Sequence, residues 1–275
     1  MITGGSRGIG AACVRLFAGA GAKVVFNYQV TQAKADELVR ECGASNCRGV
    51  QSDLSTTEAA RDLVTTAVAA FGRLDILVVN HGIWPPEDMP IDQMTKEQWH
   101  RTIAVNLDSV FGLVKYAVGQ MKKQRGATPH HAKSEPGVDR EHVPVVGTEL
   151  GGRVEEPAGH IVLVSSTAGQ RGEAFHCDYA ASKGALISMV KGLSTELARD
   201  GIRVNCVAPG WVATDMAAPA LNDPPTRAKV FATIPLGRVG TPEEVAGPIL
   251  FLCTPYAGFI TGEVFNVNGG AVLVG

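Results

Sequence analysis

Short apolar runs alternate with longer amphipathic segments along almost the whole chain. The apolar runs read as buried strands at residues 23–27, 74–79, 160–165, 203–207 and 263–267. Runs of this length, apolar on both faces, are typical of parallel sheets covered by helices on each side. The segments between them have apolar residues at helical spacing. The pattern predicts an α/β fold with a doubly wound parallel sheet, in a single domain that spans residues 1–275.

Helix boundaries are marked by capping sequences. Residues 55–58 (STTE) and 95–98 (TKEQ) read as capping boxes, and residues 241–244 (TPEE) add proline at the first helical position. The longest helix is expected to end at Gly201. Its apolar residues form one stripe that faces a core or a subunit partner, and they are Leu186, Met189, Val190, Leu193 and Leu197.

Two regions depart from a regular domain. Only Met1, Ile2 and Thr3 precede a glycine-rich loop, whereas a strand usually has about five or six residues. We expect a truncated first strand, from a truncated gene or a misplaced start codon. The second region, 125–158, is rich in Gly, Pro and charge and has no Phe, Trp or Tyr. It predicts a flexible insertion before the fifth strand, on the sheet edge opposite to the ligand-binding edge.

Composition narrows the class of protein. A chain of 275 residues with 45% apolar content is large enough for one core. The net charge of −2 does not indicate the basic surface that binding of nucleic acid requires. No apolar stretch reaches the roughly 20 residues of a membrane span. Six cysteines without CxxC spacing indicate reduced thiols. We expect a cytoplasmic protein, although a targeting segment could be missing with the truncated first strand.

The glycine-rich loop near the amino terminus predicts a dinucleotide site. It follows an apolar stub and opens a helix, which is the context that such a loop requires. Its glycines allow a tight turn and a close approach to a pyrophosphate, which the helix start favours. The loop residues expected to contact the cofactor are Thr3, Gly4, Ser6, Arg7, Gly8, Ile9 and Gly10.

The end of the next strand bears on the choice of cofactor. A carboxylate about 20 residues after the glycines would bind the ribose hydroxyls of NAD. The chain has Asn27, Tyr28 and Gln29 there, with no acid, and Arg7 lies in the glycine loop. Both features favour NADP, with Arg7 at the 2′-phosphate and Asn27 among the cofactor contacts. NAD remains possible, because Arg7 could be only a solvated cation.

A tyrosine and a lysine four residues apart predict the catalytic group. Tyr179 and Lys183 lie one turn apart on a helix face, with Ser166 upstream. An unperturbed phenol has a pKa of about 10. A neighbouring cation, from Lys183 or an oxidised nicotinamide, would lower the pKa of Tyr179 and make it a proton donor or acceptor near neutral pH.

Together these motifs resemble the short-chain dehydrogenase/reductase family in its single-domain form, with TGxxxGxG and YxxxK sequences and a Rossmann-like fold. The resemblance implies a catalytic group of Asn106, Ser166, Tyr179 and Lys183, in which Asn106 holds a water that connects Lys183 to solvent. It also implies further cofactor contacts from Asp53, Leu54, Asn80, Gly82, Tyr179, Lys183, Pro209, Gly210, Val212 and Thr214. His81 departs from the family pattern; we interpret it as a tolerated substitution beside the cofactor. The resemblance further implies a homotetramer or homodimer.

The predicted reaction is hydride transfer between NADP and a small uncharged ketone, aldehyde or secondary alcohol. A largely uncharged lid between Trp211 and Ile234, with apolar walls from Trp84, Phe175 and Trp211, favours such a substrate. One alternative is a β-ketoacyl thioester reductase that acts on acyl-carrier protein, although no helix with paired arginines for an acidic carrier is evident. Another is a dinucleotide-binding sensor or scaffold with impaired catalysis. We expect no metal site, and interpret His130, His131 and His142 as loop residues.

Overall fold

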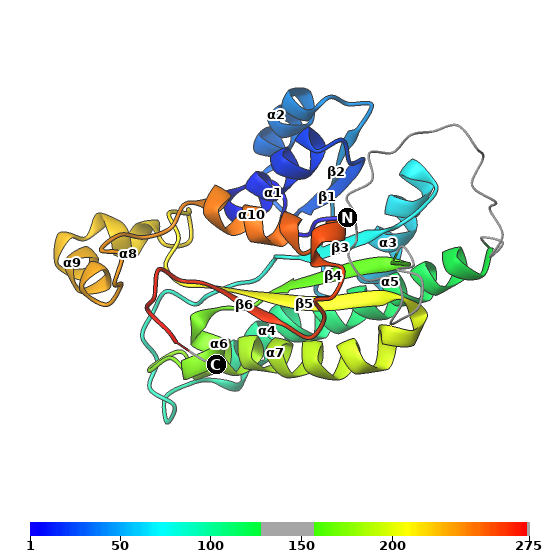
Figure 1. The fold of residues 1–275 in the computed structure, drawn as a ribbon. Coiled ribbons are helices and arrows are strands. Elements are labelled where there is room, and N and C mark those ends of the chain that lie inside the picture. The colour runs from blue at the N-terminus through cyan, green and yellow to red at the C-terminus, as the bar shows by residue number, and fades with distance from the viewer. Residues whose placement is uncertain (128–156, 274–275) are drawn as a thin grey trace.

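The fold is a parallel sheet with helices on both faces (Figure 1). The computed structural model describes residues 1–127 and 157–273. The sheet contains β1 (Val24–Tyr28), β2 (Cys47–Gln51), β3 (Ile76–Val79), β4 (Gly159–Val164), β5 (Ile202–Pro209) and β6 (Val264–Val267). Every pairing between these strands is parallel. The predicted doubly wound α/β architecture is confirmed.

The short first strand lies at the centre of the sheet. One group of strands has the order β1-β2 and the other has the order β3-β4-β5-β6. Ile2 joins the two groups, because it bridges Phe26 of β1 on one side and Val78 of β3 on the other. Backbone hydrogen bonds of 2.9 to 3.1 Å connect residues 1–3 to these neighbours. The segment is therefore too short to form a ladder of its own, yet it completes one continuous sheet.

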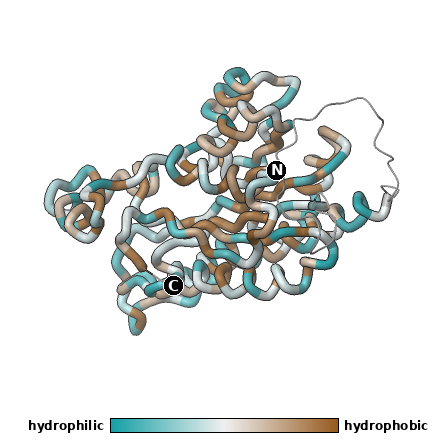
Figure 2. Tube along the Cα trace, in the orientation of Figure 1, coloured by the Kyte–Doolittle hydropathy of each residue, from teal (hydrophilic) through white to brown (hydrophobic). Residues whose placement is uncertain are grey.

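Two apolar cores lie on opposite faces of the sheet. One face carries α1 (Gly8–Gly19), α2 (Gln32–Cys42) and α10 (Pro242–Phe251), and the other carries α3 (Thr57–Phe71), α5 (Ser109–Ala127) and α7 (Cys177–Leu197). Successive strand residues alternate between them: Leu77 belongs to the α3–α5–α7 core and Val78 to the α1–α2–α10 core. Hydrophobic segments are concentrated between these layers (Figure 2).

The predicted apolar stripe of the longest helix faces the core. In α7, Leu186, Val190 and Leu197 are buried, while Met189 and Leu193 pack against the same core. A short 3₁₀ turn, Ala198–Asp200, follows α7. Gly201 ends it in the left-handed conformation, with φ 70°, as the sequence predicts.

Smaller elements surround the carboxyl ends of the strands. α4 (Lys96–Ile103) continues into a π-helical turn, Ala104–Asp108, and then into α5. α6 (Thr167–Arg171) follows β4 directly, and α8 (Ala218–Asn222) and α9 (Pro224–Ala232) follow β5 and project from the body of the domain. At the opposite edge of the sheet, a 3₁₀ turn, Pro255–Ala257, precedes β6.

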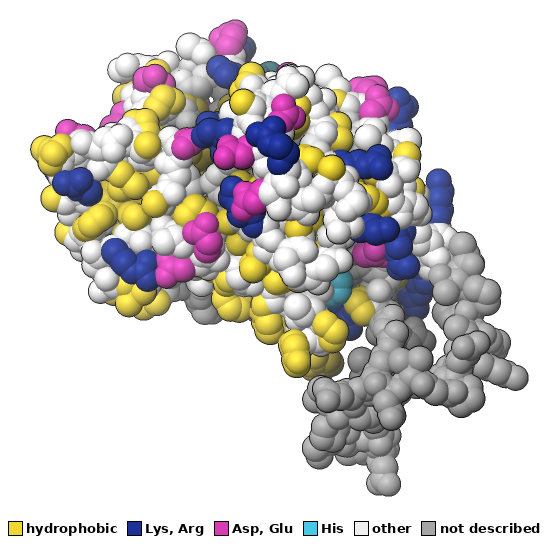
Figure 3. All heavy atoms as spheres, turned by 90° about the horizontal axis from the view of Figure 1, so that it is seen from above, with side chains coloured by type: hydrophobic (Ala, Val, Ile, Leu, Met, Phe, Trp, Pro, Cys, Tyr) yellow, Lys and Arg dark blue, Asp and Glu magenta, His cyan; other side chains and the backbone are white. Residues whose placement is uncertain are grey.

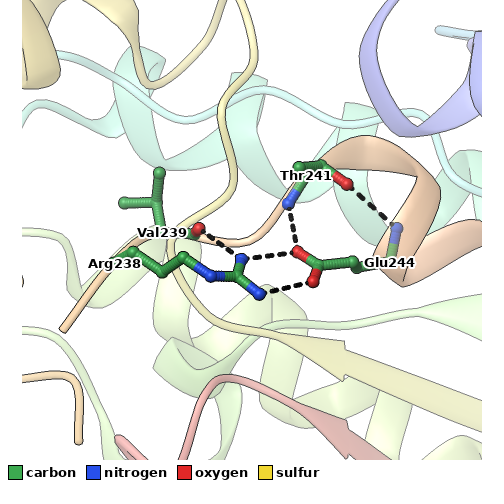
Figure 4. A network of polar contacts seen from close by, with 4 residues as sticks. All are labelled: Arg238, Val239, Thr241 and Glu244. Carbon is green, nitrogen blue, oxygen red and sulfur yellow. Dashed lines mark hydrogen bonds and ion pairs between the residues drawn. The ribbon is translucent and has the colours of Figure 1, made fainter. Parts of the chain in front are cut away.

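The start of α10 holds a loop of the candidate site. Thr241 and Glu244 form a complete capping box. Arg238 donates to both carboxylate oxygens of Glu244, at 2.8 and 2.6 Å, and to the Val239 carbonyl at 3.1 Å (Figure 4). These bonds fix the turn that contains Gly240, whose backbone pairs with Trp211 and Ala213. The cap therefore anchors the segment that follows β5.

The other two predicted caps differ in detail. Thr95 caps α4 by accepting a hydrogen bond from the Gln98 amide. The expected capping box at 55–58 is wrong by one residue, because Thr56 is the N-cap of α3 and accepts from the Ala59 amide. Ser55 and Thr56 are both suitable N-cap residues, so the sequence leaves the cap position ambiguous.

Most of the predicted insertion, 128–156, lies outside the described residues. Its flanks lie where β5 begins: the Ala158 amide donates to the Gly201 carbonyl at 2.8 Å, and Arg125 donates to the Arg199 carbonyl at 2.8 Å. This is the edge of the sheet opposite to the carboxyl ends of the strands. Within the described ranges, no helix is both long enough and apolar enough to cross a membrane.

Candidate active site

A cleft of about 630 Å³ lies along the carboxyl ends of the strands, within the range of volumes usual for ligand sites. Most of the predicted site residues line it. They are Gly4, Ser6, Arg7, Gly8, Ile9, Asn27, Asp53, Leu54, Asn80, Gly82, Ser166, Tyr179, Lys183, Pro209, Gly210, Val212 and Thr214. Ligands of doubly wound sheets bind at this edge, where loops from several strands converge.

Three predicted site residues lie behind this lining. Thr3 is fully buried, and its hydroxyl accepts hydrogen bonds from the Asn80 and His81 amides at 3.0 and 3.3 Å. A side chain at Gly10 would lie 2.0 Å from the Gly4 carbonyl oxygen. Asn106 is also fully buried. In this structure these residues position the loops that line the cleft rather than line it themselves.

The glycine loop forms a cradle that fits a pyrophosphate. Gly4 and Gly8 have positive φ values of 62° and 53°, and a side chain at Gly8 would lie 3.2 Å from Thr214. The loop leads directly into α1, whose amino end favours an anion. A larger residue at Gly8 or Gly10 would fill the cradle or push the loop apart. The residues present therefore fit a dinucleotide.

The predicted catalytic side chains converge at one end of the cleft. Ser166 caps α6, where its hydroxyl accepts a hydrogen bond from the Ala168 amide at 3.1 Å. The Lys183 ammonium donates to the Val164 carbonyl at 2.9 Å and lies 5.9 Å from the centre of the Tyr179 ring. A side chain at Gly82 would lie 3.3 Å from this ammonium. Glycine at position 82 therefore leaves space beside Lys183.

Burial shifts the pKa values of Tyr179 and Lys183. Desolvation raises the pKa of Tyr179 to about 12, while a hydrogen bond with Ser166 opposes the shift and the Glu173 carboxylate adds to it. Desolvation also lowers the pKa of Lys183 to about 8. The predicted net lowering of the Tyr179 pKa is wrong for the protein alone, because desolvation disfavours the phenolate more than its neighbours stabilise it.

Asn106 fixes the loop after β3 from the π-helical turn. Its side-chain oxygen accepts from the Ile83 amide at 2.8 Å, and its nitrogen donates to the Ile83 carbonyl at 2.9 Å and to Ser182 at 3.1 Å. A side chain at Gly82 would lie 3.2 Å from the same oxygen. The π turn therefore carries a side chain that ties the β3 loop to α7, in keeping with the frequent use of such turns at functional sites.

His81 links the glycine loop to α5. Its Nδ1 atom lies 2.8 Å from the Thr3 hydroxyl, and its Nε2 atom lies 2.7 Å from the Ser109 hydroxyl. Ser109 donates to the Val105 carbonyl at 2.6 Å, so it accepts from Nε2–H, and Nδ1 accepts from Thr3. Burial and the nearby Lys183 charge lower the pKa of His81 to about 4. Sequence reasoning missed this neutral bridge, because its partners are far apart in the chain.

At the adenosine end, the Asn27 amide is used by the protein itself. It accepts from the Gly4 amide at 2.8 Å and donates to the Ser52 carbonyl at 3.1 Å. Asn27 therefore ties the glycine loop to the ends of β1 and β2. Arg7 extends into solvent, with its guanidinium 3.6 Å from Asp215.

The substrate end has a mixed lining. Trp84, Trp211, Met216 and Ala217 line the cleft, and the two indoles pack edge to face with ring centres 6.4 Å apart. The expected wall from Phe175 is wrong, because this exposed side chain is not part of the lining.

Sequence reasoning missed four charged residues of the cleft lining: Asp215 at the other end, and here Arg101, Arg171 and Glu173. The last two lie between Ser166 and Tyr179, and that position in the chain was an available signal. Burial raises the pKa of Glu173. In the part of the chain that the structure describes, no group of three or more His, Cys, Asp or Glu is arranged to hold a metal ion.

Comparisons with known proteins find two family models that match the chain. A family model described as short chain dehydrogenase matches residues 1–128, and one described as Enoyl-(Acyl carrier protein) reductase matches residues 145–272. A 3-oxoacyl-[acyl-carrier-protein] reductase of Synechocystis sp. is 36% identical over 99% of this chain and 96% of its own length. The protein of the same description from Escherichia coli is 33% identical over 100% of this chain and 97% of its own length.

The fold also matches a solved structure of the same kind. A short-chain dehydrogenase/reductase from Brucella melitensis, titled glucose/ribitol dehydrogenase, has a TM-score of 0.80 at 32% identity, over 99% of this chain and 95% of that one. The regions of this chain that align with these relatives include both halves of the sheet, the glycine loop and the Tyr179–Lys183 pair. The chain therefore belongs to the short-chain dehydrogenase/reductase family, as an oxidoreductase that acts on CH–OH or keto groups and has a Rossmann-like NAD(P)-binding fold.

Proposed function

We propose that the protein is an NADP-dependent reductase of uncharged carbonyl compounds. The observation that carries the proposal is the convergence of Ser166, Tyr179 and Lys183 in a cleft that continues into the glycine cradle. A bound nicotinamide cofactor would supply the hydride. Tyr179 donates its proton to the substrate oxygen, and Ser166 donates a hydrogen bond that stabilises the charge developing there. Asn106 lies behind the cleft lining. Its role is to hold the loop after β3 and a water that connects Lys183 to solvent.

The protonation states favour reduction near neutral pH. A phenol whose pKa is raised to about 12 is protonated, which is the form that donates a proton to a carbonyl oxygen. Lys183 remains mainly an ammonium below its lowered pKa of about 8. The cation then stabilises the phenolate left after proton transfer. Tyr179 therefore carries the proton that reduction requires, although the sequence predicted a lowered pKa.

The adenosine end supports NADP. Arg7 lines the cleft, while β1 ends with Asn27 and Tyr28 and is followed by Gln29, with no carboxylate for the ribose hydroxyls. A guanidinium can bind phosphate with two parallel hydrogen bonds. We further propose that the protein acts in the cytoplasm as a homodimer or homotetramer.

The substrate end supports an uncharged reacting group. Trp84 and Trp211 supply apolar walls, and the Glu173 carboxylate is close enough to Tyr179 to raise its pKa. An anionic group beside the reacting carbonyl would be repelled by this carboxylate. Ketones and aldehydes with neutral substituents avoid that repulsion.

A second candidate is the reduction of a β-ketoacyl thioester. Relatives 33 to 36% identical are described as 3-oxoacyl-[acyl-carrier-protein] reductases. The sequence shows no helix with paired arginines, but the structure brings Arg101 of α4 and Arg171 of α6 to the lining of one cleft. Both are exposed, so they are available to a phosphate of a carrier-bound or coenzyme A thioester.

NADPH oxidation across a substrate panel tests these candidates. The panel contains neutral ketones, a ketone carboxylate of similar size, acetoacetyl-coenzyme A and a carrier-bound β-ketoacyl thioester. The proposal expects turnover of neutral ketones above that of the carboxylate. Preference for the thioesters, lost when Arg101 and Arg171 are both changed to Gln, would favour the second candidate. Cofactor binding without turnover of any compound would indicate a sensor or scaffold and contradict both.

A further inference from the structure

Asp215 bridges two cations that come from distant parts of the chain. Its Oδ2 atom lies 2.9 Å from the Lys34 ammonium and 3.6 Å from the Arg7 guanidinium. Arg7 precedes α1, Lys34 lies in the first turn of α2, and Asp215 lies in the segment after β5. The cluster therefore joins three elements around one end of the cofactor cleft.

The ion pairs of this cluster can exchange their partners for another ion. The side chains of Arg7, Lys34 and Asp215 are 55%, 53% and 51% exposed, and exposed ion pairs contribute little to stability. On the face that carries α1, α2 and α10, acidic and basic side chains are interspersed (Figure 3). An anion that offers more acceptor oxygens can thus replace this carboxylate without breaking a buried contact.

The cluster also adjoins the part of the cleft expected to hold the cofactor ribose. Ser6, Thr31 and Asp215 line the cleft there together with Arg7. The Ser6 and Thr31 hydroxyls lie 2.5 Å apart. No acidic residue follows β1 directly. The carboxylate at this position is that of Asp215, which lies 181 residues after Lys34 in the chain.

The Asp215 segment packs on the glycine loop. A side chain at Gly8 would lie 3.2 Å from Thr214, the residue before Asp215. The segment is held on its other side by the Ala213 amide, which donates to the Gly240 carbonyl at 2.9 Å. The ion pairs therefore fasten the free side of this segment to α2.

We propose that Asp215 is a built-in competitor of the 2′-phosphate of NADP, an inference that rests on the proposed NADP dependence. In the free protein Asp215 occupies Arg7 and Lys34. The 2′-phosphate displaces it, binds both cations and releases the segment around Asp215 from α2. The 2′-hydroxyl of NAD carries no charge, so it leaves the ion pairs of Asp215 with Arg7 and Lys34 in place. We call these ion pairs the latch. Lys34 and Asp215 thereby join Arg7 in setting cofactor preference.

Binding of two adenosine probes tests the proposal without measuring catalysis. Adenosine 2′,5′-bisphosphate carries the 2′-phosphate, and 5′-AMP lacks it. In the Asp215→Asn variant, we expect the bisphosphate to bind about threefold to tenfold more tightly and 5′-AMP to bind as in wild type. In Lys34→Met, the bisphosphate should bind more weakly, and the gain from Asp215→Asn should shrink when the two changes are combined.

Glu41→Gln is the matched control. It removes one exposed carboxylate at the other end of α2, where Glu41 pairs with Arg15 at 2.8 Å. The net charge changes as in Asp215→Asn, but the ratio of the two affinities should stay at the wild-type value.

Hydrogen exchange of the peptide that contains residues 213–217 supplies a second readout. Exchange should rise in Asp215→Asn and on addition of the bisphosphate to wild type, but not on addition of 5′-AMP. Unchanged bisphosphate affinity in Asp215→Asn, or an equal gain for both probes, would overturn the latch while the reductase proposal stands. If wild type binds both probes equally, NADP preference is wrong, and the latch is wrong with it.

Discussion

The two ends of the cleft differ in how far their polar and charged side chains are exposed to solvent. At the nicotinamide end the working groups are buried: Lys183 is 4% exposed and donates to a backbone carbonyl, and Asn106 is fully buried with three hydrogen bonds. At the adenosine end, Arg7 and Lys34 are more than half exposed and share one carboxylate. Buried groups hold geometry and shifted pKa values, whereas exposed ions exchange partners easily. We therefore expect the chemistry at Tyr179 and Lys183 to be fixed and the cofactor preference to be adjustable.

The largest effect that separates the two ends is expected from Lys183→Met. The change keeps most of the side-chain volume but removes the charge and the bond to Val164. We expect kcat for ketone reduction to fall about 100- to 1,000-fold, because the phenolate formed at Tyr179 loses its cation. Lys191→Met, on an exposed position of the same helix, is the control and should stay near wild type. Stopped-flow measurement of NADPH oxidation checks this; a loss below tenfold would contradict the assignment.

The pH dependence of reduction should report the buried ammonium. Below the lowered pKa of Lys183, about 8, the side chain is charged and kcat/KM stays level. Above it the proton is lost, so kcat/KM falls by about tenfold for each further pH unit. Tyr179, with its pKa raised to about 12, stays protonated throughout. A profile measured from about pH 6 to 10 that stays flat at its alkaline end contradicts this interpretation.

A smaller effect is expected at the adenosine end. Arg7→Gln removes one exposed cation, so KM for NADPH should rise about tenfold while kcat changes less than twofold. KM for NADH should not change, because NADH has no 2′-phosphate. Arg15→Gln, on the outer face of α1, is the control. Steady-state kinetics with both cofactors make the measurement, and equal changes for both would refute the role of Arg7.

Local sequence predicted the nicotinamide end better than the adenosine end. Tyr179 and Lys183 are one helical turn apart, so their proximity follows from the chain itself. The contact of Lys34 with Asp215 spans 181 residues and depends on the whole fold. β2 was also missed, because only Cys47 of its five residues is buried and the strand lacks an apolar run. The direction of the Tyr179 pKa shift depends on burial, which the spacing of two residues does not reveal.

The account depends most on the phenol of Tyr179 as the proton donor. Single-turnover reduction by Tyr179→Phe, with NADPH affinity measured in parallel, tests it directly; Tyr116→Phe, on α5, is the control for loss of a hydroxyl. We expect a rate at least about 100-fold below wild type, with NADPH affinity within about twofold and the Tyr116 variant unaffected. A Tyr179→Phe variant that reduces the substrate at the wild-type rate would contradict the central claim.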